Sequence, residues 1–198
     1  MNGLISIADI SRVFTKKGYV LFEDDKKPFN LNLIGIRSID NTPNVFNDLF
    51  IMAWKYKGHW SVVKLQATTD PGLYWLENPM NNMGTAILKP GQYRGMWAWG
   101  KHKGYPAFQQ VKNCTVIRDF DRDGELDYNS GREETGMFGI NNHHASYSGE
   151  SVQVDKWSAG CQVIANIHED NLKVAIAEQA LIYWNNSFTY TLIEEKDF

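Results

Sequence analysis

Between residues 50 and 67 the chain reads Phe50-Ile51-Met52-Ala53-Trp54-Lys55-Tyr56-Lys57-Gly58-His59-Trp60-Ser61-Val62-Val63-Lys64-Leu65-Gln66-Ala67. Residues 50–56 and 60–67 are rich in aromatic, β-branched and other apolar side chains, which favour strands. Lys57-Gly58 separates the two runs, and glycine readily adopts the positive φ of a tight hairpin turn. This stretch predicts an antiparallel β-hairpin.

Short apolar or alternating runs of the same kind continue on both sides of the hairpin. They cover Tyr19–Phe22, Leu31–Ile36, Thr85–Leu88, Tyr93–Trp99 and Phe108–Ile117. Turn signals such as Asp70-Pro71-Gly72 and Lys89-Pro90-Gly91 separate them. We therefore predict a mainly β fold, either a sandwich or a barrel.

Two segments have the 3.6-residue period of a helix instead. Ser6 with Asp9 resembles a capping box, so a short N-terminal helix should run to about Lys17 and stop at Gly18. Asn166 should cap a second helix that ends at Asn185-Asn186, and a last strand should follow through Phe188, Tyr190 and Leu192. No repeat or linker divides residues 1–198, which predicts a single domain.

Composition excludes several classes of partner. The 20 basic and 23 acidic residues give a net charge of -3, and no basic cluster stands out, so we expect no nucleic-acid partner. No apolar run is long enough for a membrane span, so we expect no membrane partner. The first residues lack the basic start of a secretory leader, which predicts synthesis in the cytoplasm and reduced thiols at Cys114 and Cys161.

The chemistry concentrates between residues 136 and 166, around the tetrapeptide Ser158-Ala159-Gly160-Cys161. A cysteine directly after a glycine can stand at the tip of a tight turn. There the backbone N–H groups of Gly160 and Cys161 would face a bound carbonyl oxygen and stabilise its negative charge. Cys161 is therefore a candidate nucleophile.

A thiol needs a base to draw off its proton, and His143 and His144 are the nearby candidates. In an extended run, Asn141 and His143 share one face while His144 faces the other way. We expect His143 to be the base, oriented by Asn141 or by a backbone carbonyl. The alternative is that the cysteine is a buried apolar residue and that the histidines only lie on the surface.

His143, followed after fourteen residues by Ser158-Ala159-Gly160-Cys161, resembles the signature of the L,D-transpeptidase catalytic domain. The resemblance implies that family's mainly β fold and attack of the thiolate on peptidoglycan stem peptides through a thioester. It also implies site roles for Ser158 and Gly160. The chain departs from the signature at Ala159, where the family often has a second histidine, and at Gln162-Val163-Ile164, where a basic residue is usual.

Because that basic residue is missing, we expect Arg132 or Lys101 to bind a substrate carboxylate. Trp157 and His102 are further candidates for substrate contacts. Water as acceptor would give hydrolysis, which we expect, and an amine would give exchange. Such an enzyme would act on the cell wall after release, or as a component of a virion or of lysis. The alternative is a non-enzymatic structural or wall-binding protein of the same fold.

A second motif is the acidic stretch of residues 119–127. Carboxylates at relative positions 1, 3, 5 and 9, with Gly124 at position 6, match the start of an EF-hand calcium loop. Ser130 stands at position 12, where a glutamate is usual. The sequence predicts a structural calcium ion, not needed for the chemistry, or else a solvated acidic loop. The candidate ligands are Asp119, Asp121, Asp123, Glu125 and Asp127.

Overall fold

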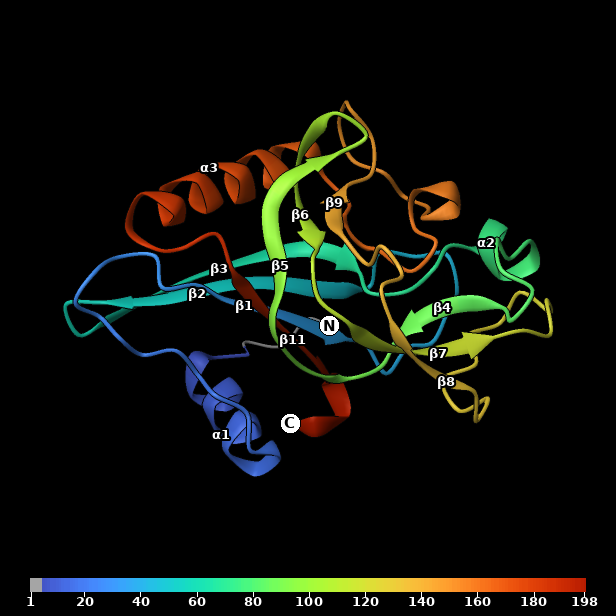
Figure 1. Cartoon of the computed structure of the whole chain (residues 1–198), viewed down its shortest axis with the longest axis horizontal. Helices are drawn as coiled ribbons and strands as arrows, with labels where there is room; N and C mark the ends of the chain where they lie inside the picture. The colour runs from blue at the N-terminus through green and yellow to red at the C-terminus, as the bar shows by residue number, and fades with distance from the viewer. Residues whose placement is uncertain (1–4) are drawn as a thin grey trace.

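Eight strands close a barrel in the computed structural model, which describes residues 5–198 (Figure 1). Around the barrel the order is β1-β11-β5-β6-β9-β10-β3-β2. The strands are β1 (Asn32–Arg37), β2 (Asp48–Tyr56), β3 (His59–Thr68), β5 (Gly91–His102), β6 (Tyr105–Gln110), β9 (Asn142–His144), β10 (Gln162–Ile164) and β11 (Phe188–Glu194).

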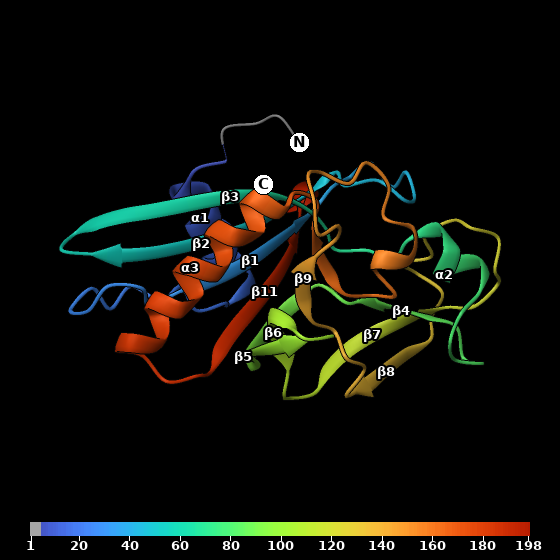
Figure 2. The ribbon, with the colours of Figure 1, turned by 90° about the horizontal axis from the view of Figure 1, so that it is seen from above.

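A second, three-stranded sheet lies to one side of the barrel (Figure 2). It contains β4 (Thr85–Leu88), β7 (Cys114–Asp119) and β8 (Glu133–Gly136) in the order β4-β7-β8. Leu88 and Val116 of this sheet belong to the same buried cluster as Phe50, Trp97 and Ile164 of the barrel. The two sheets therefore share one hydrophobic core.

The predicted hairpin is confirmed as β2 and β3, which pair antiparallel from Tyr56↔His59 to Asp48↔Ala67. Lys57 and Gly58 form the turn with φ of 49° and 82°. Two consecutive positive φ values are those of a type I′ turn, whose twist matches that of the strands.

Both predicted helices are confirmed. The capping box of Ser6 and Asp9 starts α1 (Ile7–Lys17), and Gly18 ends it in the left-handed conformation. Apolar residues of α1 pack on the outer side of the barrel wall formed by β1, β2 and β11. Asn166 caps α3 (Ile167–Tyr183), which crosses over the barrel (Figure 2) and ends before the predicted Asn185-Asn186. The short helices are α2 (Leu73–Glu77), η1 (Asp155–Trp157) and η2 (Glu195–Asp197).

The mainly β class with an N-terminal helix and a helix in the C-terminal half is thus confirmed, but two predicted strands are wrong. Residues 19–22 form no strand, because side chains satisfy their backbone: Gln92 accepts from the N–H of Val20, and Asn32 accepts from that of Phe22. The run 108–117 is broken at the exposed residues 111–113, where the chain leaves the barrel for the second sheet.

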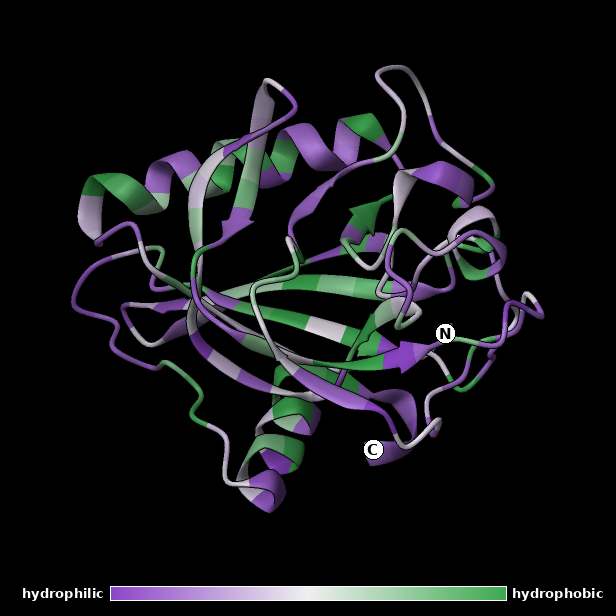
Figure 3. Cartoon of the chain, turned by 45° about the vertical axis from the view of Figure 1, so that its right-hand side comes forward, coloured by the Kyte–Doolittle hydropathy of each residue, from purple (hydrophilic) through white to green (hydrophobic). Residues whose placement is uncertain are grey.

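Hydrophobic residues gather on the strands of the barrel, whereas the connecting loops are mostly hydrophilic (Figure 3). Among the described residues, no helix is long and apolar enough to cross a membrane. Met1 to Leu4, which contribute to the expectation that no leader is present, lie outside the described residues.

Candidate functional site

Parallel pairing of β9 with β10 brings the two halves of the sequence motif together. His143 is paired with Val163, and Asn142 with Gln162. The N–H of Gln162 also donates to the carbonyl of Asn141 at 2.8 Å, which continues the pairing toward Cys161. Cys161 lies two residues before Val163, so its side chain is on the same face as that of His143.

Cys161 and His143 line one pocket with a volume of about 300 Å³. His144, on the other face of β9, does not line it. Most of the wall is apolar or aromatic, and two lysines provide charge. The lining residues are Trp75, Met80, His102, Lys103, Phe138, Gly139, Ile140, His143, Lys156, Trp157, Ala159 and Cys161.

The turn before Cys161 is held by the buried hydroxyl of Ser158. This hydroxyl accepts from the N–H of Gly160 at 3.1 Å and donates to the carbonyl of Cys161 at 2.8 Å. The prediction that the Gly160 N–H faces a substrate oxyanion is therefore wrong, since Ser158 occupies it. The N–H of Cys161 has no hydrogen-bond partner within the described part of the chain.

Gly160 is required in this turn by its surroundings. Its φ is 120°, which disfavours any residue with a Cβ. A Cβ built there would also lie 2.3 Å from the carbonyl oxygen of Ala86 in β4. The close approach of two backbones places the turn against the second sheet.

The thiol of Cys161 is protonated at rest. It donates to the carbonyl of Gly139 at 3.3 Å, and burial raises its pKa above the ordinary value. Attack on a carbonyl therefore requires a base that removes the proton during the reaction.

His143 is oriented by a backbone carbonyl and not by Asn141. Its Nδ1 lies 2.7 Å from the carbonyl oxygen of His144, which can only accept, so Nδ1 carries the proton. The hydroxyl of Tyr105 lies 3.3 Å from the same nitrogen. Nε2 has no hydrogen-bond partner among residues 5–198, and in this tautomer it can accept a proton.

Asn141 has a different task from the one predicted, because it fixes His102. Its Oδ1 accepts from the N–H of Gln110 at 2.8 Å, so its Nδ2 faces Nδ1 of His102 at 3.1 Å. His102 in turn stacks on His143, with ring centroids 4.2 Å apart and planes within 3°. The two imidazoles form one wall of the pocket.

The surroundings of His143 keep its imidazole neutral. Burial lowers the pKa of His143 to about 3, with a further contribution from the neighbouring His102. Lys173, buried on α3, disfavours the cationic ring as well. In its resting state this pocket therefore holds a neutral base and a neutral thiol.

The structure separates the predicted substrate contacts. Trp157 and His102 line the pocket with Cys161, whereas Arg132 and Lys101 do not. The guanidinium of Arg132 lies over the ring of Phe120 instead, 3.7 Å from its centroid. The cations that reach the pocket are Lys103 and Lys156, which sequence reasoning missed. Their proximity in sequence to His102 and Trp157 was the available signal.

Comparison with family models, curated proteins and solved structures found no match to this chain. The resemblance to the L,D-transpeptidases rests on the spacing of His143, Ser158, Gly160 and Cys161, and it stays a prediction.

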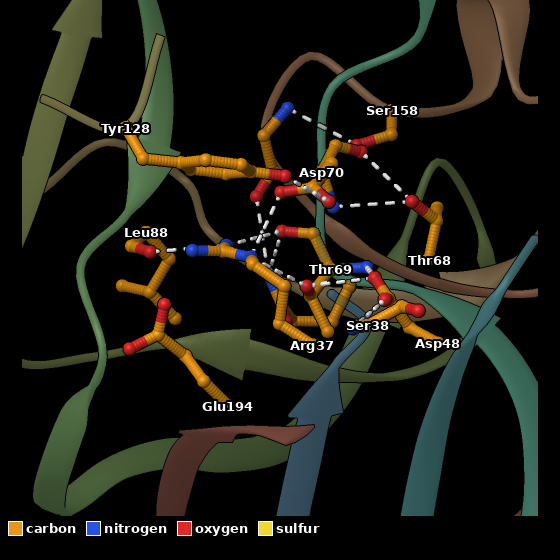
Figure 4. Close-up of polar contacts among 12 residues, drawn as sticks. Arg37, Ser38, Asp48, Thr68, Thr69, Asp70, Leu88, Tyr128, Ser158 and Glu194 are labelled. Atoms are coloured by element: carbon orange, nitrogen blue, oxygen red, sulfur yellow. Dashed lines mark hydrogen bonds and ion pairs between the residues drawn. The ribbon is translucent and has the colours of Figure 1, made fainter. Parts of the chain in front are cut away.

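A buried polar network around Arg37 and Asp70 lies next to Ser158, the residue that holds the Cys161 turn (Figure 4). Arg37 donates to the side chain and the carbonyl of Thr69 and pairs with Asp70 at 3.0 Å. Asp48 accepts from the N–H of Thr69 at 2.6 Å, and burial, followed by the charge of Asp70, raises its pKa to about 7. The network fixes the segment leading to Gly72, whose N–H donates to the carbonyl of Ser158.

Two aromatic side chains of the barrel core hold the segments that carry the site. Trp97 donates its indole N–H to the carbonyl of Ile140 at 2.7 Å. Tyr190 stacks on Trp97 at 4.2 Å and donates its hydroxyl to Gln162 at 2.6 Å. These buried bonds link residues 140 and 162, next to Asn141 and Cys161, to the rigid core.

The acidic stretch of residues 119–127 does not line the Cys161 pocket. Asp119 ends β7 and is 1% exposed, while Asp121, Asp123 and Glu125 are exposed. Burial and the neighbouring carboxylates raise the pKa of Asp119 to about 6. Within residues 5–198, no group of three or more His, Cys, Asp or Glu side chains is gathered closely enough to hold a metal ion.

Proposed function

We propose that the chain is a cysteine-dependent acyl transferase or hydrolase that acts on peptidoglycan stem peptides. The observation that supports this most directly is that Cys161 and His143 line the same pocket. The imidazole is held by its Nδ1, and its Nε2 is available as a base. The chemistry of such a pair is nucleophilic attack on a carbonyl carbon.

In the proposed first step, Sγ of Cys161 forms a bond to the carbonyl carbon of the substrate while its proton passes to Nε2 of His143. The developing oxyanion accepts from the N–H of Cys161. Collapse of this intermediate breaks the amide C–N bond, and the proton moves from His143 to the leaving amine. A thioester on Cys161 remains.

The acceptor then decides the reaction. Water would release the shortened peptide as a carboxylic acid, with His143 again acting as base. A second amine would instead form a new amide bond. We propose hydrolysis as the main outcome and exchange as the alternative.

The pocket favours a peptide that carries a negative charge. Lys103 and Lys156 line it, and none of its described lining residues is acidic. Trp75 and Trp157 give the pocket an apolar surface for the aliphatic part of a substrate side chain. Stem peptides with a free carboxylate fit this combination, and the lysines take the place of the predicted Arg132 or Lys101.

Incubation of the full chain with purified muropeptides, followed by mass spectrometry, tests the proposal. Hydrolysis would add the mass of water across a cleaved bond, and exchange would give a product with a new amine. Cys161→Ala should abolish either change, whereas Cys114→Ala should keep most of it. Equal activity of both variants would disprove the nucleophile assignment. Binding without any mass change would favour the non-enzymatic, wall-binding alternative.

A further inference from the structure

The acidic loop of residues 119–127 begins at the end of β7 and forms the first part of the connection to β8. Gly124 is buried with φ of 84°, a conformation that favours glycine. Asp123 and Glu125 continue the turn, and the N–H of Glu125 donates to Oδ1 of Asp123 at 2.8 Å. This geometry alone does not require an ion.

The carboxylate of Asp119 is the feature of this loop that indicates a bound cation. It is 1% exposed, and its Oδ1 has no hydrogen-bond partner among the described residues. Its Oδ2 accepts from the N–H of Asp127 at 3.1 Å, so the carboxylate points into the loop. A buried carboxylate oxygen without a partner is costly, and a bound cation removes that cost.

We propose that this loop binds one calcium ion through Asp119, Asp121, Asp123 and Asp127. Hard carboxylate oxygens at positions 1, 3, 5 and 9 are typical calcium ligands, and position 7 normally contributes its backbone carbonyl. Glu125 is at position 7, so its side chain is not needed as a ligand. The exposed side chains of Asp121 and Asp123 turn toward Asp119 on binding.

The site should be weak by the standards of calcium sensors. Position 12 is Ser130, whose hydroxyl donates to the carbonyl of Arg118 at 2.7 Å, so the usual bidentate glutamate is missing. A dissociation constant on the order of 10⁻⁴–10⁻³ M is typical of extracellular calcium modules, and we expect this range.

Calcium bound there would stabilise the wall behind the Cys161 turn. Tyr128 directly follows Asp127, and its hydroxyl donates to Asp70 at 2.9 Å (Figure 4). Asp70 belongs to the network that fixes Gly72 against Ser158. Calcium binding at this loop does not depend on the Cys161 chemistry, so it can be measured without an activity assay.

Titration calorimetry and thermal unfolding of the full chain test the proposal in chelator-treated buffer of constant ionic strength. We expect binding in the stated range and a Tm increase of roughly 3–10 °C at 10 mM CaCl₂. Asp121→Ala and Asp123→Ala should lose both effects. Glu125→Gln removes one charge from the same loop and should keep them.

The proposal is overturned if the unmodified chain shows neither binding nor a Tm increase. It is also overturned if Glu125→Gln loses as much as Asp121→Ala, because the effect would then be charge screening. An equal Tm increase with MgCl₂ would likewise indicate charge screening and overturn the proposal. Magnesium requires a stricter octahedral geometry than calcium, so a specific calcium site should not respond equally to both ions.

Discussion

The imidazole of His102 lies parallel to that of His143, with the ring centroids 4.2 Å apart. Asn141 fixes His102 from the side, and the carbonyl of His144 fixes His143. Two positive charges at this distance would repel strongly, and burial already penalises one. The stack therefore favours a neutral His143, which is the form that can accept a proton from Cys161.

The first prediction concerns the titration of His143. Nitrogen NMR of the imidazoles should show His143 neutral, with the proton on Nδ1, from pH 8 down to about pH 4. His102→Ala should raise the pKa of His143 toward its ordinary value, because it removes both the covering ring and a competing charge. His102→Phe keeps the covering ring and should raise it less. Titration of His143 near pH 6.5 in the unmodified chain would contradict this account.

The same shift predicts how stability depends on pH. Between pH 6.5 and about 3 the unfolded chain protonates His143 while the folded chain does not, so this residue lowers the free energy of unfolding as the pH falls. Above pH 6.5 it contributes nothing. From pH 7 to 4.5 the loss should be about 2.5 kcal/mol. Urea unfolding at both pH values should show that His143→Gln lacks this loss. Subtracting the free energies of unfolding of the variant from those of the unmodified chain cancels the contributions of the carboxylates.

The roles of the adjacent histidines can be separated by activity. His143→Ala should reduce turnover of muropeptides by roughly 10²–10⁴-fold, because the general base is lost. His144→Ala should reduce it far less, since that side chain lies on the other face of β9 and contacts Tyr105 and Tyr147. Steady-state kinetics of the two variants decide the question. A reversed ranking would move the base to His144.

The chemical state of the thiols predicts their labelling. Cys161 should react slowly with iodoacetamide at pH 7 and faster as the pH rises, because its raised pKa leaves little thiolate. Cys114 is 1% exposed, and burial raises its pKa to about 12. In the Cys161→Ala variant, where Cys114 is the remaining thiol, we therefore expect labelling only after unfolding in urea. Peptide mass spectrometry assigns the labelled residue. Fast labelling of Cys161 at pH 6 would show a thiolate paired with an imidazolium instead.

The sequence predicted the elements whose local signals agree with their surroundings. The hairpin around Lys57-Gly58 and the caps Ser6 and Asn166 are local features, and each lies where predicted. The predictions from sequence were wrong where tertiary contacts determine the structure of a segment instead of its local pattern. Residues 19–22 look like a strand but use the side chains of Gln92 and Asn32 as partners, and no local pattern encodes such distant bonds.

In the candidate site, too, some features could be predicted from local sequence and others depend on tertiary contacts. Spacing and strand alternation place Cys161 and His143 in one pocket, as the motif suggested. The partners of Asn141 and Gly160 could not be read from the motif, because both depend on which atom lies nearest after folding. In the folded chain the side chain of Asn141 bonds to Gln110 and His102, and the N–H of Gly160 donates to Ser158. Lys103 and Lys156 reach the pocket through a hairpin tip and a short 3₁₀ helix whose positions depend on the whole barrel.

The last prediction concerns Gly160. Gly160→Ala should lower the free energy of unfolding by roughly 3 kcal/mol, because it combines an unfavourable φ with a clash against backbone. The added Cβ would lie 2.3 Å from the carbonyl oxygen of Ala86, which cannot move without displacing β4. Gly58→Ala is the matched control, since its φ is 82° but no atom lies within 4 Å of a Cβ there, and it should cost about 1 kcal/mol. Equal losses in urea unfolding would mean that the turn yields without strain, and that contact with β4 does not position Cys161.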